Sequence, residues 1–311
     1  RVFVSRDVID FATPSHNGPG GPDGRMYAIT MDGYLQVYHI NGTMAPEFVR
    51  EYDMRPWGIF QANSRPNQIV AGVPAFYYPG GAWEFRTVVG LSCDQEAVVV
   101  DLTDESAPAV IVRSGPWSNG VSIDGEEGVL YSAAESGGLQ IVQLRKDGLD
   151  GPMYGQVGTA TPPVGLEGYE VRSVYSLGSD VLYVGYGTVG SGGARVGYLS
   201  KGVRQGNGVG EVWRLGPPDD YESLLGTPTW RIDSTVWKDG HYLLSGSNEI
   251  GHERAVICDL GGSAKYEAWQ ESDLFRNSLR TWRSGSSILL GSGALVAVGW
   301  TLVYWPGQGY L

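Results

Sequence analysis

The sequence predicts an all-β fold made of repeated four-stranded units, and three observations lead to this prediction. A six-residue pattern returns five times: a small or apolar residue, any residue, Val or Ile, two variable residues, then Leu or Ile. No segment keeps the 3.6-residue apolar period of an amphipathic helix. The 47 glycines among 311 residues follow no fixed period, which indicates many tight turns.

The copies of the six-residue pattern are spread over most of the chain. They are Leu35–Ile40, Ala97–Leu102, Leu139–Leu144, Ala194–Leu199 and Ala255–Leu260. The second and fifth copies are close to identical around Asp101 and Asp259. A strand that recurs within a repeat of roughly 40 to 60 residues is typical of stacked copies of one supersecondary unit.

A periodicity of arginines suggests how many units there are. Six arginines are separated by 49, 58, 59, 59 and 49 residues, and each follows an extended-looking segment. They are Arg6, Arg55, Arg113, Arg172, Arg231 and Arg280. The two patterns agree on about six units.

Within a unit, the pattern predicts four strands. In the fourth unit these are residues 173–176, 181–186, 195–199 and 211–215, and in the fifth unit residues 233–237, 241–245, 255–260 and 265–269. Turn residues separate paired strands at Gly178–Asp180 and Lys238–Gly240. Four-stranded units repeated about six times without helices describe a β-propeller. An extended sandwich or a β-solenoid is the alternative, although solenoid repeats are usually shorter.

We therefore expect residues 1–311 to form a single β-propeller domain. The blades are predicted roughly at 6–54, 55–112, 113–171, 172–230, 231–279 and 280–311 plus 1–5. The last blade is short, and the N-terminal strand at Val2–Ser5 is expected to supply its outer strand. Closing the ring in this way removes exposed sheet edges.

Two segments carry a resemblance to a known group of proteins. Residues 97–108 and 138–144 resemble repeats of the β-propeller superfamily at large, in which an apolar strand runs into an Asp-Pro type of turn. The resemblance implies the fold and no particular activity, because propellers include enzymes, receptors and scaffolds. Neither the Gly-His and Trp-Asp signature of WD40 repeats nor a sialidase-type Asp box is present.

Charge and composition narrow the classes of partner. The net charge of −12 disfavours direct binding to nucleic acid. Residues 284–311 carry no charge, but their Gly, Ser, β-branched and aromatic content predicts two buried strands rather than a membrane span. Cys93 and Cys258 are expected to be buried, reduced thiols.

If the six arginines begin the innermost strands, they form a ring near one mouth of the central channel. Such a ring binds carboxylate or phosphate, and sialidase-like propellers use inward arginines in this way. Glu170 and Tyr175 would then assist Arg172. The simpler interpretation, which we favour, pairs each arginine with an Asp or Glu of the neighbouring blade. No catalytic residue and no protein metal site is predicted, although Ca²⁺ in the channel is possible, with Asn119, Asn248 and Asp233 as ligands.

The second unit is longer than the others, and the extra length is aromatic. Four aromatic residues, Phe76, Tyr77, Tyr78 and Trp83, flank a Pro/Gly turn. Tyr and Trp dominate the energetics of protein interfaces, so the segment predicts an interaction loop. The alternative is a hairpin whose rings fold back onto the blade.

These observations predict a non-catalytic structural or protein-interaction propeller. Protein partners in a larger assembly are expected, such as a phage tail or other virion, with a virion or extracellular location and possible oligomerisation. The alternative is a propeller hydrolase that acts on an acidic sugar or lactone in the central channel. No cofactor is predicted apart from the possible Ca²⁺.

Overall fold

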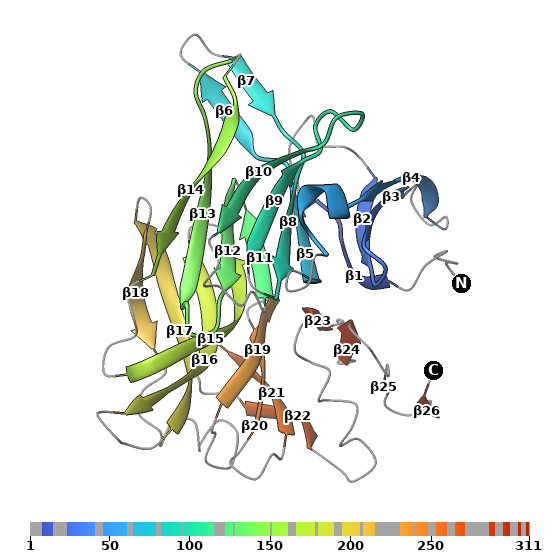
Figure 1. Cartoon of the computed structure of the whole chain (residues 1–311). Helices are drawn as coiled ribbons and strands as arrows, with labels where there is room; N and C mark the ends of the chain where they lie inside the picture. Colours follow the sequence, from blue (N-terminus) through green and yellow to red (C-terminus); the bar gives the residue numbers. More distant parts are fainter. Residues whose placement is uncertain are drawn as a thin grey trace. The chain divides into compact units, whose positions relative to one another are not determined.

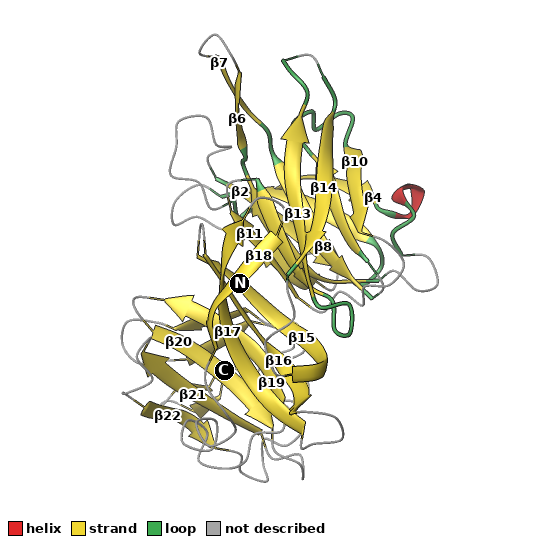
Figure 2. Cartoon of the chain, turned by 90° about the vertical axis from the view of Figure 1, so that its left-hand side faces the viewer, coloured by secondary structure: helices red, strands yellow, loops and turns green. Residues whose placement is uncertain are grey.

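The computed structural model describes residues 8–14, 24–40, 46–60, 65–78, 82–94, 96–114, 122–126, 128–149, 151–160, 166–177, 180–189, 195–205, 208–214, 231–238, 241–247, 253–259, 265–270, 286–289, 295–298, 304–305 and 309–310. From residue 208 on, only the backbone is described. Strands make up nearly all of this part, and its single helix is a short 3₁₀ turn, η1 (Arg55–Trp57) (Figure 2). The all-β prediction is confirmed.

The chain divides into two compact units, of which the first comprises residues 1–132 and 140–159. Its first sheet has four antiparallel strands in chain order (Figure 1). They are β1 (Val8–Ala12), β2 (Arg25–Thr30), β3 (Tyr34–His39) and β4 (Glu47–Asp53). Consecutive side chains are buried in the two central strands, residues 27–30 of β2 and 35–38 of β3, so both faces of the sheet are covered there.

The second sheet of this unit has the order β10–β9–β8–β5. Its strands are β5 (Pro66–Gly72), β8 (Val88–Cys93), β9 (Ala97–Asp101) and β10 (Ala109–Ser114). Between β5 and β8 the chain forms a separate two-stranded sheet of β6 (Ala75–Tyr78) and β7 (Ala82–Phe85). This hairpin accounts for the extra length of the second unit of the sequence.

The third sheet has the order β11–β12–β13–β14. Its strands are β11 (Ser122–Glu126), β12 (Val129–Ala133), β13 (Leu139–Lys146) and β14 (Met153–Thr159). Residues 133–139, which connect β12 to β13, belong to the second compact unit.

The three four-stranded sheets of the first unit pack as propeller blades do. The first strand of each sheet contacts the next, β1 against β5 and β5 against β11, while at the opposite edge β10 contacts β14. One cluster of buried apolar side chains lies between the first two sheets and includes Ile29, Leu35 and Leu91. A second cluster lies between the second and third sheets and includes Val99 and Val142. The core is thus a set of layers between adjacent blades.

The second unit comprises residues 133–139 and 160–311. It has two four-stranded antiparallel sheets and two two-stranded sheets among its described residues. The first sheet is β15 (Leu166–Leu177), β16 (Asp180–Val189), β17 (Arg195–Gln205) and β18 (Gly208–Arg214). The second is β19 (Arg231–Lys238), β20 (His241–Ser247), β21 (Glu253–Asp259) and β22 (Lys265–Gln270). Here too, the first strands β15 and β19 contact each other.

The two-stranded sheets lie in the uncharged C-terminal stretch. β23 (Ser286–Leu289) pairs with β24 (Leu295–Val298), and β25 (Tyr304–Trp305) pairs with β26 (Gly309–Tyr310). Among the described residues, no helix is long and apolar enough to span a membrane. A sixth blade and its closure by Val2–Ser5 stay predictions, because residues 1–7 lie outside the described part.

The six-residue pattern marks the same strand in each four-stranded sheet. Its copies fall in β3, β9, β13, β17 and β21, and each of these is the third strand of its sheet, counted from the first. This strand lies between two neighbours, so both of its backbone edges are paired. In β3, β9 and β13 its Leu, Ile and Val side chains are buried. The repeat in the sequence is therefore a repeat of one structural position.

Candidate interaction surface

The hairpin of β6 and β7 is held in register by four residue pairs. Ala75 lies opposite Phe85, Phe76 opposite Glu84, Tyr77 opposite Trp83 and Tyr78 opposite Ala82. Below the hairpin, the Arg86 N–H donates to the Pro74 carbonyl over 3.0 Å. Because side chains alternate along a strand, the four predicted aromatic residues fall on two different faces.

One face of the hairpin is exposed and aromatic. The Tyr77 and Trp83 side chains are directly opposite, are 59% and 61% exposed, and have ring centroids 5.0 Å apart at an interplanar angle of 54°. The hairpin extends beyond the strands of its blade in both views (Figures 1 and 2). Two of the four predicted aromatic rings are therefore exposed, and that they bind a partner stays a prediction.

The other face of the hairpin folds back onto the blade. Phe76 packs against the apolar cluster between the second and third sheets. Tyr78 is buried, its hydroxyl donates to Glu84 Oε2 over 2.9 Å, and Lys146 Nζ lies 5.4 Å from its ring centroid. This inward face fixes the direction in which the exposed pair projects.

Charged groups fasten the base of the hairpin to β13. Lys146 Nζ lies 2.9 Å from Glu84 Oε2, and Arg86 also pairs with Glu84. Burial opposes ionisation of Glu84, but hydrogen bonds from Lys146 and Tyr78 and the charge of Arg86 outweigh it, so the pKa of Glu84 is lowered. Glu84 is therefore ionised at neutral pH and keeps the hairpin anchored.

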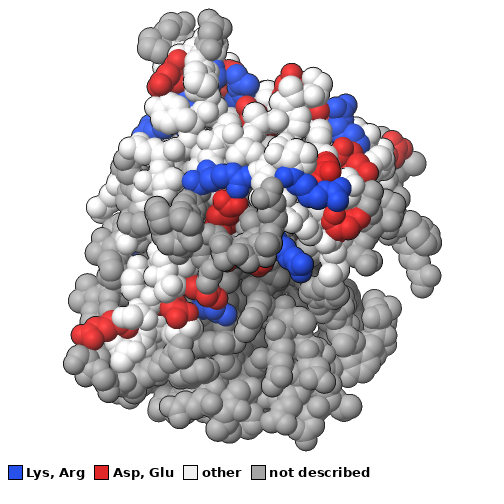
Figure 3. Space-filling view, in the orientation of Figure 1, with Lys and Arg blue, Asp and Glu red and all other residues white. Residues whose placement is uncertain are grey.

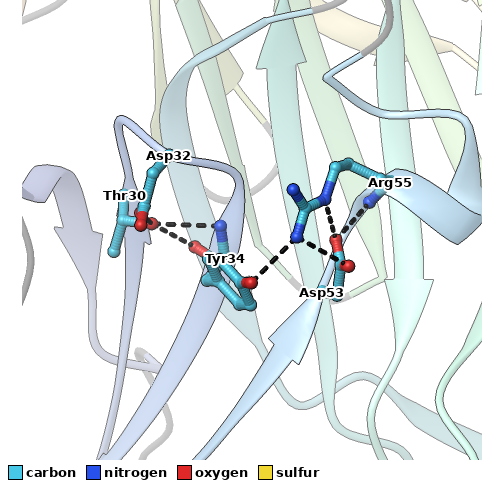
Figure 4. Close-up of polar contacts among 5 residues, drawn as sticks. All are labelled: Thr30, Asp32, Tyr34, Asp53 and Arg55. Carbon is cyan, nitrogen blue, oxygen red and sulfur yellow. Dashed lines mark hydrogen bonds and ion pairs between the residues drawn. The ribbon is translucent and has the colours of Figure 1, made fainter.

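Arg55 pairs with a carboxylate two residues away (Figure 4). Its Nε and Nη2 donate to the two carboxylate oxygens of Asp53 over 2.7 and 2.9 Å, and Nη2 also donates to the Tyr34 hydroxyl over 2.8 Å. The turn before Tyr34 is closed by Thr30 Oγ1, which donates to Asp32 over 2.7 Å and accepts from the Tyr34 N–H over 3.0 Å. Hydrogen bonds from Arg55 lower the pKa of Asp53, so the pair is ionised.

Arg113 lies in β10, at the opposite edge of its sheet from β5. This departs from the predicted position at the start of an innermost strand. Its Nη1 lies 2.6 Å from Glu96 Oε1. Its Nη2 lies against Gly58, which caps η1 in a left-handed conformation (φ 73°) and donates its N–H to the Arg55 carbonyl. The structure thus brings the Arg113 guanidinium beside the turn that carries Arg55.

Arg172 lies within β15 and pairs with Glu135 of the segment 133–139. Glu135 has a positive φ of 45° and exchanges backbone hydrogen bonds with Val171. The predicted helper Glu170 accepts instead from the Tyr186 hydroxyl, and its carbonyl accepts from Tyr198 over 2.9 Å. Tyr175 lies on the same strand at intermediate burial.

The side chains of the remaining predicted channel residues lie outside the described part of the structure. Arg231 is the first residue of β19, and Asp233 follows on the same strand, both described by backbone alone. Arg6, Arg280, Asn119 and Asn248 lie outside the described residues. Among the residues that are described, no group of three or more His, Cys, Asp and Glu side chains could hold a metal ion.

The contacts that join the first two sheets were not among the predicted residues. Glu105 lies in the turn between β9 and β10, and its Oε1 is 3.3 Å from Arg25 Nε. Its carbonyl accepts from Arg50 over 2.8 Å and from Tyr52 over 2.7 Å. These residues carry no repeat signal, so only the structure reveals the junction. On the face in Figure 3, basic and acidic side chains likewise lie next to one another.

No protein-family model and no curated protein matches the chain. Among solved structures it is similar to a candidate 6-phosphogluconolactonase from Bacteroides fragilis, with 8% identity over 93% of this chain and 76% of that chain and a TM-score of 0.52. A candidate 6-phosphogluconolactonase from Bacteroides uniformis matches with 8% identity over 93% and 77% of the two chains, at a TM-score of 0.51. The Cps50 (Swd1) β-propeller domain from Myceliophteria thermophila matches with 10% identity over 97% and 82%, at a TM-score of 0.50. At such identities the likeness concerns the fold alone, and with the four-stranded sheets it shows that this chain is a β-propeller.

Proposed function

We propose that this chain is a non-catalytic propeller that binds a protein partner through the β6–β7 hairpin. The observation that carries the proposal is the exposed Tyr77–Trp83 pair on a hairpin whose opposite face and base are fixed. Tyr and Trp bury large areas with little loss of side-chain entropy. A prearranged pair lowers the cost of ordering an interface further.

The arginines support a structural role over an anion-binding ring. Arg55, Arg113 and Arg172 each pair with a carboxylate of this chain. A guanidinium that is already engaged must give up this partner before it binds an acidic substrate. The competing function, a hydrolase of acidic sugars or lactones, therefore requires that these arginines break their ion pairs with the neighbouring carboxylates before they bind substrate.

We place the partner in a larger assembly, with a phage tail or other virion as the specific proposal. Its support is compositional: an acidic chain with 47 Gly, 18 Tyr and 10 Trp. A propeller suits such a role because a closed stack of blades presents loops and hairpins on a rigid frame.

The test compares the wild-type chain with the double variant Tyr77→Ala/Trp83→Ala and the matched control Phe48→Ala. Phe48 is also an exposed aromatic residue of the first unit, at 53% exposure, but lies on β4. In extract of the source organism, we expect the wild type and the control to enter a complex of higher mass by light scattering, and the double variant to stay out of it. Equal complexes for all three chains, or turnover of 6-phosphogluconolactone by the purified chain, would contradict the proposal.

A further inference from the structure

The hairpin has an edge whose backbone groups point outward. The hydrogen bond from the Arg86 N–H to the Pro74 carbonyl shows that Pro74 and Arg86 form a hydrogen-bonded pair of the antiparallel ladder. Because such pairs alternate with non-hydrogen-bonded pairs, Phe76–Glu84 is hydrogen-bonded, whereas Tyr77–Trp83 is not. The N–H and C=O groups of Ala75 and Tyr77 therefore point away from β7.

This outer edge of β6 has the properties of a docking edge. Among the described residues, β6 pairs with β7 and with no other strand. Ala75 and Tyr77 are both exposed. A row of unpaired backbone groups is a template for an added strand, and several peptide-binding domains recognise extended segments in this way.

Charge and ring chemistry indicate what binds there. The net charge of −12 makes a second copy of this chain repel the first and attracts a basic segment. Tyrosines in this molecule already bind cations on their faces: Lys146 lies over Tyr78 and Arg55 over Tyr34, at 5.4 and 5.3 Å from the ring centroids. In the part of the chain that is described, no cation lies over Tyr77 or Trp83, the two rings that face outward.

We propose that the outer edge of β6 receives an extended, Lys- or Arg-bearing segment of a protein partner, which adds as a third strand to the hairpin. Its backbone bonds to Ala75 and Tyr77, and the side chain opposite Tyr77 places its cation over the exposed rings. This rests on the proposed function and specifies how the partner is held.

The probe is a fluorescein-labelled eight-residue peptide of alternating Lys and Val, measured by anisotropy against the purified chain. The variant Ala75→Pro removes one outward N–H, leaves both rings in place and keeps the inward ladder, because proline is tolerated where its nitrogen faces solvent. Ala75→Ser is the matched control that keeps the N–H. The second probe is a pair of peptides of the same sequence, each methylated on one of the two alternate sets of backbone nitrogens, which leaves the protein unchanged.

We expect saturable binding of the Lys-Val peptide by the wild type and by Ala75→Ser. Ala75→Pro, or methylation of the peptide on the nitrogens that face β6, should weaken binding by roughly tenfold or more. Strand addition would be overturned if Ala75→Pro bound the Lys-Val peptide as tightly as the wild type and the wild type bound both methylated peptides as tightly as the unmethylated one. It would also be overturned if the wild type did not bind the Lys-Val peptide at all. Equal affinity for a Glu-Val peptide would overturn the basic occupant, and a dimer that Ala75→Pro abolishes would assign the edge to a second copy.

These outcomes separate the inference from the function on which it rests. If the backbone variants have no effect while Tyr77→Ala/Trp83→Ala still prevents assembly, the hairpin binds its partner by side chains alone. If the double variant assembles normally, the proposed function itself is wrong.

Discussion

Asp10 is an acid buried at the junction of the first two blades. Asp10 lies in β1 and is 7% exposed, and its Oδ2 accepts the Ile69 N–H of β5 over 3.0 Å. Burial raises the pKa of Asp10 to about 7, although hydrogen bonds from the Ile69 and Phe11 backbone lower it. The folded chain thus keeps a proton on Asp10 that the unfolded chain releases near pH 4. The contribution of Asp10 to folding stability therefore falls as the pH rises from about 4 to 7 and changes no further above that.

Asp10→Asn should remove this dependence, because the amide keeps an acceptor oxygen for Ile69 and does not titrate. Between pH 5 and 8 we expect the wild type to lose about 2–3 kcal/mol more unfolding free energy than the variant. Guanidinium chloride unfolding of both chains at the two pH values measures this difference, since groups common to both cancel. Parallel pH dependences would show that Asp10 ionises in the folded state as it does in the unfolded one.

At the level of the element, hydrogen-bonded and non-hydrogen-bonded pairs alternate along the β6–β7 hairpin. This alternation predicts that slowly and rapidly exchanging amides alternate along each strand. The amides of Phe76, Tyr78 and Glu84 point inward to the partner strand and should exchange slowly, whereas those of Tyr77 and Trp83 point outward. We expect a difference of about tenfold or more in protection between the two sets. Residue-resolved hydrogen exchange tests it, and a Tyr77 amide as protected as that of Phe76 would mean that this edge is already paired in the free protein.

The blades were predictable from the sequence because a strand's apolar pattern is local. The copies Ala97–Leu102 and Ala255–Leu260 are alike because both occupy a third strand with neighbours on each side. The near-equal spacing of the arginines said less about where the strands lie. The inserted β6–β7 hairpin occupies part of the interval between Arg55 and Arg113, and Arg113 falls in β10 instead of at the start of an inner strand. Long-range contacts such as Asp10–Ile69 join residues with no shared pattern, so the sequence could not reveal them.

At the scale of the whole molecule, ring closure by the N-terminal strand is the prediction with the largest effect on stability. A last blade built from β23 to β26 without a further strand would leave an edge of apolar residues open to other chains. We expect deletion of residues 1–5 to lower the midpoint of thermal unfolding by roughly 5 °C or more and to cause association that light scattering detects. A synthetic peptide of residues 1–7 added in excess should restore the midpoint, because binding to the folded state alone stabilises it. A truncated chain with an unchanged midpoint and mass would mean that the ring closes without this strand. A loss of stability that the peptide does not reverse would mean that residues 1–5 stabilise the chain in some way other than ring closure.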